Sequence, residues 1–205
     1  MASSKIQIVQ RAAALTGNGA ITSLDDGSEV AACINAVWDG RVEAMLTQHA
    51  WKFARRVSPL TKLSDPVEKP WTALWAAPAG MLALQYVLDT ASGRRVEVEE
   101  RDLVSGRALA VIGEHDALSA AHTYRVTEDR WPGDFCLAIQ RYLEADLLRT
   151  INEQIDQADR REKAAMMLEQ RARTRDQRSS TANDPAEWDL AEARGGSAQW
   201  YWQRG

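Results

Sequence analysis

The residues able to do chemistry are few, and they lie far apart along the chain. The histidines are His49, His115 and His122, and none has a partner at metal-ligand spacing. His49 lies beside an apolar helical stripe, which favours a structural role over that of a ligand or base. Gly17-Asn18-Gly19 lacks both the third glycine and the preceding strand of a phosphate-binding loop. We therefore predict no catalytic residue, no metal site and no cofactor, and we do not expect an enzyme.

Two further groups of reactive or charged side chains have structural explanations. Cys33 and Cys136 are far apart, neither belongs to a CxxC pair, and each lies in an apolar helical pattern. This favours buried free thiols over a disulfide. Glu99, Glu100 and Asp102 form an acidic cluster in a predicted hairpin. A solvated strand end explains that cluster better than a metal site.

A run of basic side chains ends the last predicted helix. It comprises Arg171, Arg173, Arg175 and Arg178. Such a run complements the negative end of the helix dipole. It is also typical of a surface that contacts an acidic partner or DNA, and we carry it forward as a candidate partner-binding site.

The segment after residue 178 is the most unusual part of the sequence. It is poor in aliphatic residues and rich in Ser, Ala, Gly and Asn, so it cannot form a core of its own. It nevertheless carries Trp188, Trp200, Tyr201 and Trp202, with Gly195-Gly196 between them. Trp and Tyr are enriched in interface hot spots. We expect these aromatics to dock onto a partner, and the alternative is that they pack back onto the same domain.

The spacing of apolar residues defines the elements that must position these groups. Positions three or four apart predict four helices near residues 5–15, 28–54, 132–151 and 153–178, the first capped by Ser4. Between the second and third helices, prolines break the chain into short pieces. Alternation there predicts two to four strands, with residues 81–88 as either strand or helix.

These elements predict a mainly α protein. We expect an antiparallel bundle of about four helices in residues 1–178, a small antiparallel β insertion at about 58–131, and an extended docking tail at 179–205. The 205 residues are 45% hydrophobic and 26% charged, which is enough for one core. A net charge of −4 argues against general affinity for nucleic-acid phosphates. Neither an N-terminal signal peptide nor an apolar run of membrane-spanning length is found, so we expect synthesis in the cytoplasm and no membrane contact.

Short motifs follow one another in order between about residues 4 and 178. The most specific is Trp51-x-Phe53-Ala54-x-Arg56-x-x-x-Leu60. The others are Ala14-Leu15-Thr16-Gly17, Ile21-Thr22-Ser23-Leu24, Val37-Trp38-Asp39-x-Arg41, Pro78-Ala79-Gly80-Met81-Leu82, Tyr124, and Trp131-Pro132-x-x-Phe135 followed by Leu143, Ala145, Leu147 and Leu148. In this order the chain resembles the tail tubular protein A, or head-to-tail adaptor, family of short-tailed phages and gene-transfer agents. It departs from the family at Trp38, where Tyr is usual, and nothing beyond Thr181 matches.

The resemblance implies a structural role and carries over no catalytic residue. Members of the family form a ring of twelve identical subunits under the portal protein, extend the DNA channel and offer a platform to downstream tail proteins. The implied fold is a helical bundle with a β-rich insertion, and the implied location is the head-tail junction of the virion. DNA would then be only cargo passing through the channel.

An alternative function comes from the arginine run. The chain could be a phage DNA-packaging or regulatory protein that binds nucleic acid through the arginine-rich helix end. A gel shift with duplex DNA that weakens as salt is raised would favour this alternative.

Overall fold

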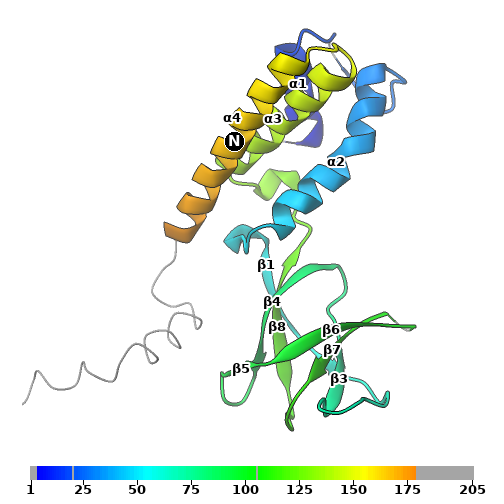
Figure 1. The fold of residues 1–205 in the computed structure, drawn as a ribbon, viewed down its shortest axis with the longest axis vertical. Helices are drawn as coiled ribbons and strands as arrows, with labels where there is room; N and C mark the ends of the chain where they lie inside the picture. Colours follow the sequence, from blue (N-terminus) through cyan, green and yellow to red (C-terminus); the bar gives the residue numbers. More distant parts are fainter. Residues whose placement is uncertain (1–3, 20, 105, 179–205) are drawn as a thin grey trace, which may run out of the picture.

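The structure, a computed structural model, describes residues 4–19, 21–104 and 106–178. They form two lobes joined end to end, which Figure 1 shows as helices above and strands below. The helical lobe contains α1 (Lys5–Leu15), α2 (Glu29–Thr47), the short 3-10 helices η1 (Lys52–Ala54) and η2 (Glu128–Arg130), α3 (Gly133–Thr150) and α4 (Ile155–Arg178). The β lobe contains the eight strands between Arg55 and Tyr124.

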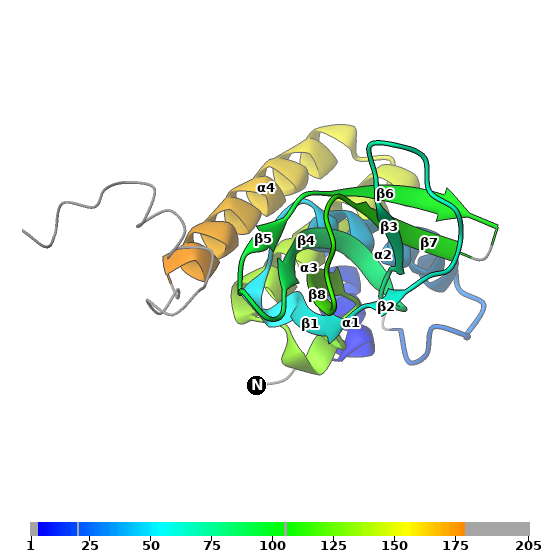
Figure 2. The same cartoon turned by 90° about the horizontal axis from the view of Figure 1, so that it is seen from below.

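Helix α3 is the centre of the helical lobe, because α1, α2 and α4 all pack against it. Helix α1 begins with a capping box in which the Ser4 side chain accepts from the backbone N–H of Gln7 and the Gln7 side chain accepts from that of Ser4. Helix α4 runs antiparallel along α3, and its C-terminal end projects beyond the β lobe (Figures 1 and 2). Its inner face is made of small side chains such as Ala158, Ala165 and Ala172, which let the two helices approach closely.

Helix α2 ends seven residues before the predicted boundary, at Thr47 instead of residue 54. The reason is Trp51, whose indole Nε1 donates to the backbone oxygen of Met45 at 2.7 Å. Helix ends leave carbonyls without intrahelical partners, and this bond satisfies one of them. The chain then leaves the helix axis through η1 and enters the β lobe at Arg55.

The β lobe consists of two antiparallel four-stranded sheets. Their strand orders are β1-β8-β4-β5 and β2-β3-β7-β6. The strands are β1 (Arg55–Pro59), β2 (Thr61–Lys62), β3 (Ala73–Ala76), β4 (Met81–Asp89), β5 (Arg95–Val96), β6 (Val98–Leu103), β7 (Gly106–Val111) and β8 (Leu118–Tyr124). The chain crosses from one sheet to the other at Leu60, and side chains including Trp75, Val87, Leu109 and Leu118 fill the space where the sheets meet.

The predicted fold class is wrong. About 45% of the structure is helical and 24% is strand, so this is an α+β fold and not a mainly α bundle with a small β insertion. The four helices begin within two residues of where the apolar spacing placed them, and only the end of α2 differs by more than that. The strand region, however, holds eight strands instead of two to four, because strands of two to four residues are too short for alternation to be recognised.

Several smaller predictions are confirmed. The segment that was either helix or strand is the long strand β4. Cys33 and Cys136 are free thiols as predicted, but only Cys136 is buried, and the predicted burial of Cys33 is wrong because it is partly exposed. The segment 179–205 lies outside the described residues, so the extended docking tail stays a prediction.

Candidate functional site

Aromatic residues of three family-like motifs come together in one cluster at the junction of the lobes. Phe135 on α3 lies at its centre, with ring centroids 5.2 Å from Trp51, 5.1 Å from Phe53 and 5.0 Å from Trp131. Trp38 of α2 stacks on Trp131 at 6.0 Å. We call these five residues the aromatic cluster. Edge-to-face pairs of this kind add stability beyond the area that they bury.

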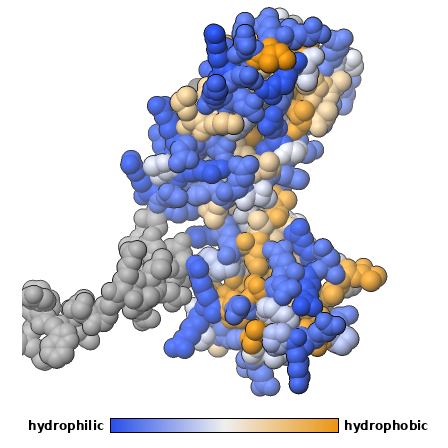
Figure 3. Space-filling view, viewed as in Figure 1, coloured by the Kyte–Doolittle hydropathy of each residue, from blue (hydrophilic) through white to orange (hydrophobic). Residues whose placement is uncertain are grey.

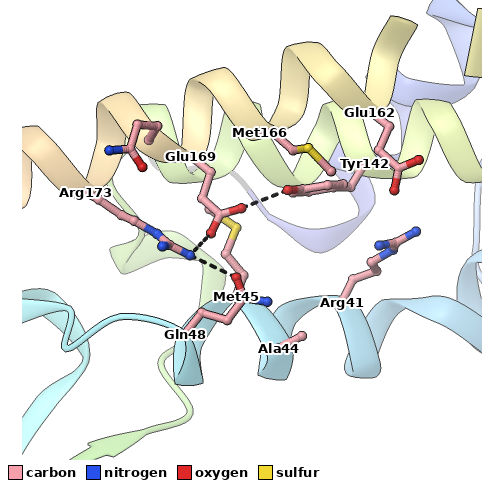
Figure 4. A pocket seen from close by; sticks show the side chains of 10 residues that line it. Arg41, Ala44, Met45, Gln48, Tyr142, Glu162, Met166, Glu169 and Arg173 are labelled. Atoms are coloured by element: carbon pink, nitrogen blue, oxygen red, sulfur yellow. Dashed lines mark hydrogen bonds and ion pairs between the residues drawn. The ribbon is translucent and has the colours of Figure 1, made fainter. Parts of the chain in front are cut away.

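Above this cluster, an open groove of about 380 Å³ separates α2 from α4 (Figure 4). Tyr142 of α3 contributes to its wall. The other lining residues come from the two outer helices: Arg41, Ala44, Met45, Gln48, Glu162, Met166, Glu169, Gln170 and Arg173. Met166 is exposed, whereas each charged residue of the lining has an ion-pair partner: Glu169 binds Arg173, and Arg41 and Glu162 bind groups outside the lining.

The first of these bonds joins α2 to α3. Arg41 donates to both carboxylate oxygens of Asp146, at 3.0 and 2.6 Å. The Asp146 carboxylate raises the pKa of Arg41, and the guanidinium also lies over the ring of Tyr142 at 5.2 Å. Asp146 is buried, so the pair fixes how α2 sits on α3.

The second set of bonds crosses the groove from α3 through α4 to α2. The Tyr142 hydroxyl donates to Glu169 at 2.8 Å, and Arg173 donates to Glu169 and, at 2.8 Å, to Gln48 (Figure 4). Burial of the hydroxyl and its bond to Glu169 raise the pKa of Tyr142. Three helices are therefore connected through one buried carboxylate.

A third carboxylate, Glu144, is fully buried between α3 and α4. It accepts from Gln140 at 2.9 Å and Arg141 at 2.6 Å, and it pairs with Arg161 of α4 at 3.3 Å. Buried pairs of this kind contribute little net stability but strongly disfavour arrangements that leave the charge unpaired. The groups around the groove thus fix the helices in one arrangement.

The structure divides the four arginines predicted as a partner-binding site. Arg173 is one of the groups that bind Glu169, so it faces the groove. Arg171, Arg175 and Arg178 line a second open groove of about 590 Å³ together with Asp134, Leu168, Gln170 and Thr174. Arg175 pairs with Asp134 at 2.7 Å, although 77% of its side chain stays exposed.

Next to this basic groove is a small apolar pocket of about 210 Å³. Trp51, Pro132 and Ala172 supply its apolar surface, and Asp134, Arg175 and Asp176 complete its lining. Asp176 accepts from the backbone N–H of Lys52 and lies 3.3 Å from Nε2 of His49, so it connects the end of α4 to η1. The pocket is therefore formed by the end of α4, the start of α3 and the residue before η1.

The remaining predicted residues lie elsewhere. Trp188, Trp200, Tyr201 and Trp202 fall outside the described residues. Glu99, Glu100 and Asp102 lie on the edge strand β6, where Glu99 pairs with Arg101 and Glu100 with Arg107. Within residues 4–178 as described, no group of three or more His, Cys, Asp or Glu side chains could hold a metal ion. No described helix is long and apolar enough to cross a membrane.

Sequence reasoning missed the buried charges. The sequence alone pointed to no role for Glu144, Asp146 or Glu169, and Arg41 was noted only as part of a motif. The detectable signal was the position of Glu144 and Asp146 beside Leu143 and Leu147 of the apolar stripe of α3. The arginine partners, up to 105 positions away along the chain, could not be paired from one sequence.

No family model matches the chain, and no curated protein matches it.

Proposed function

We propose that the protein is a structural adaptor subunit of a phage head-to-tail connector. In this function identical subunits form a twelve-membered ring under the portal protein. The ring extends the DNA channel, in which DNA is only passing cargo, and its free face is the platform for downstream tail proteins. In this function the protein is made in the host cytoplasm and is assembled into the virion at the head-tail junction.

The aromatic cluster is the observation that carries this proposal. The motifs behind the family resemblance are separated by about eighty residues, yet their aromatic side chains pack around Phe135 at the junction of the lobes. Large aromatic side chains are generally buried, but here the residues that meet are those of the motifs on which the resemblance rests. Their convergence supports the view that the motifs preserve one shared architecture.

The helical lobe also suits contacts between neighbouring subunits. A ring with heterologous contacts needs two different surfaces on each subunit that keep a constant angle to each other. The buried pairs Arg41–Asp146 and Arg161–Glu144 hold α2 and α4 at fixed positions on α3. The outer face of α4 is densely charged, as expected for a polar interface.

The decisive experiment mixes the full-length protein with the portal protein of the same phage and images the product by negative-stain electron microscopy. We expect a ring of additional density on one face of the portal, with the symmetry of the portal. Cross-linking within particles should join identical subunits. The proposal fails if no portal complex forms, or if cross-links join this chain only to other proteins.

A second candidate function rests on the basic groove. Because Arg171, Arg175 and Arg178 line one surface, the chain could instead bind nucleic acid there as a packaging or regulatory protein. Against this, Arg175 is already paired with Asp134 and the net charge is −4. A salt-sensitive gel shift that the double variant R171E/R178E abolishes, and R160E on the far half of α4 does not, would favour nucleic-acid binding over the adaptor.

A further inference from the structure

The apolar pocket at the base of α4 has the size of one side chain. Its volume of about 210 Å³ is below the range of roughly 300–1,000 Å³ that is usual for small-molecule sites. Trp51 and Ala172 form part of the hydrophobic core, so the pocket opens directly onto buried apolar surface. An aromatic ring placed there would extend the aromatic cluster outwards by one member.

The pocket adjoins three arginines on one side, whereas the two carboxylates in its own lining, Asp134 and Asp176, already have partners within the folded lobes. The basic groove with Arg171, Arg175 and Arg178 shares Asp134 and Arg175 with the pocket. Within the described residues, Arg171 and Arg178 make no ion pair, and Arg175 remains largely exposed beside Asp134. The site is thus complementary to a peptide in which an aromatic residue is flanked by carboxylates.

The chain itself contains such a peptide just beyond α4. Trp188 is preceded by Glu187 and followed by Asp189, with Asp184 nearby. The other aromatic group, Trp200 to Trp202, lacks acidic neighbours and is followed by Arg204. Charge complementarity therefore selects Trp188 and disfavours the last three aromatics.

The chain between the end of α4 and Trp188 is also long enough to reach the pocket. The nine residues from Ser179 to Glu187 can span up to about 30 Å. From the end of α4 back to Ala172 is six residues, or about 9 Å along the helix axis. A segment tethered this closely has an effective concentration on the order of millimolar, so even a weak peptide contact would be populated.

We propose that Trp188 docks into this pocket of its own chain, with Glu187 and Asp189 facing Arg171, Arg175 and Arg178. The last aromatic group, beyond Gly195-Gly196, then remains available to a partner. This inference does not depend on the adaptor function, because it concerns the isolated chain.

The test uses the full-length protein labelled with 5-fluorotryptophan and observed by fluorine NMR. The Trp188 resonance is the one missing from W188F. We expect it to be displaced from the position of a free indole, to show little H2O/D2O isotope shift, and to stay the same as the protein concentration is varied. A Trp188 resonance that has the position and isotope shift of an exposed indole would overturn the proposal. Protection that develops only at high concentration would also overturn it, because the occupant would then belong to a second copy.

Charge variants test the same docking from both sides. E187K/D189K alters only the segment beyond the folded lobes, so it cannot fail by unfolding them. We expect it, like R175E, to lower the ratio of docked to free Trp188 about fivefold or more. R175E combined with E187R should recover part of the loss. R160E makes the same charge change about 22 Å further up α4 and should leave the resonance in place. Equal effects of R175E and R160E would refute the assigned site.

Discussion

The two lobes differ in how charged side chains take part in their packing. The helical lobe buries large aromatic side chains and three carboxylates, and each carboxylate is bound by an arginine from another helix or from the same one. The core of the β lobe is filled by apolar side chains from Ala108 and Ala120 up to Trp75, and its arginine–glutamate pairs lie on the more exposed edge strand β6 and its neighbour β7. Long-range polar bonds thus specify the arrangement of the helices, while antiparallel pairing specifies that of the strands.

The surfaces of the two lobes also differ. In the helical lobe the charged groups line grooves between helices. In the β lobe a hairpin of β6 and β7 projects to one side (Figures 1 and 3), and the fully exposed Val104 lies between the two strands. A rigid helical body with a projecting hairpin is compatible with the proposed ring subunit. The helices would keep the subunit angle, and the hairpin would be able to contact a neighbour.

The largest effect should come from opening the aromatic cluster. Phe135 is fully buried and contacts three other aromatic rings, so F135A should lower the free energy of unfolding by about 3–5 kcal/mol. Denaturant titration followed by circular dichroism measures this. L137A, two residues away on α3 but exposed, is the control and should change stability by less than about 1 kcal/mol. Similar losses for both would mean that the cluster is not the centre of the core.

Removing an ion pair should cost more stability in the helical lobe than in the β lobe. D146A leaves the partly buried Arg41 without its bidentate partner and should cost about 2 kcal/mol. E99A removes an exposed carboxylate that pairs with Arg101 at 3.5 Å and should cost about 0.5 kcal/mol or less. The same denaturant titrations compare them. If E99A proved as costly as D146A, the contrast between buried and exposed pairs would be lost.

The packing of the β lobe can be tested by adding volume. Ala120 is fully buried between the sheets, so A120L should overpack this core and cost about 1–3 kcal/mol. Amide hydrogen exchange should show faster exchange in residues 55–124 than in α3 and α4. The control A117L places the same side chain on an exposed position of the preceding loop. Equally faster exchange in both lobes would show that they unfold as one unit.

The difference between the lobes also explains how much of the structure was predictable. Ser4, the stripe of α3 and the alanines of α4 are local signals, and they place all four helices to within a few residues except at the end of α2. That end depends on the bond from Trp51 to Met45, which is tertiary. In the β lobe, β2 has only two residues and exists only through its pairing with β3, so no alternation predicts it.

The candidate site was predictable only in part for the same reason. The arginine run was found because four like charges stand close together in the sequence. Which of them faces a groove is decided by the helix phase, and the partner of each is decided by chain packing. The residue types of the apolar pocket, Trp51, Pro132 and Ala172, look like ordinary core positions until the fold brings them together.

The smallest expected effect is the loss, at acid pH, of one loop contact in the β lobe. Asp89, at the end of β4, accepts from the backbone N–H groups of Ala91 and Ser92, from the Ser92 hydroxyl, and from Nδ1 of His115 at 2.7 Å. The bonds from Ser92 and from His115 lower the pKa of Asp89 to about 2.

Because this pKa lies below the ordinary aspartate value of 3.8, the ionised carboxylate favours the folded state above that pH. The contribution is lost as the pH falls from about 4 to about 2, when the carboxylate is protonated. We expect the protection of amides in the loops on either side of Asp89 and His115, measured against the intrinsic exchange rate at each pH, to fall in this window while that of the helical lobe changes less. D89N should show fast exchange there already at neutral pH and little further change on acidification. Wild-type and D89N proteins with the same acid dependence would show that other carboxylates control this part of the β lobe.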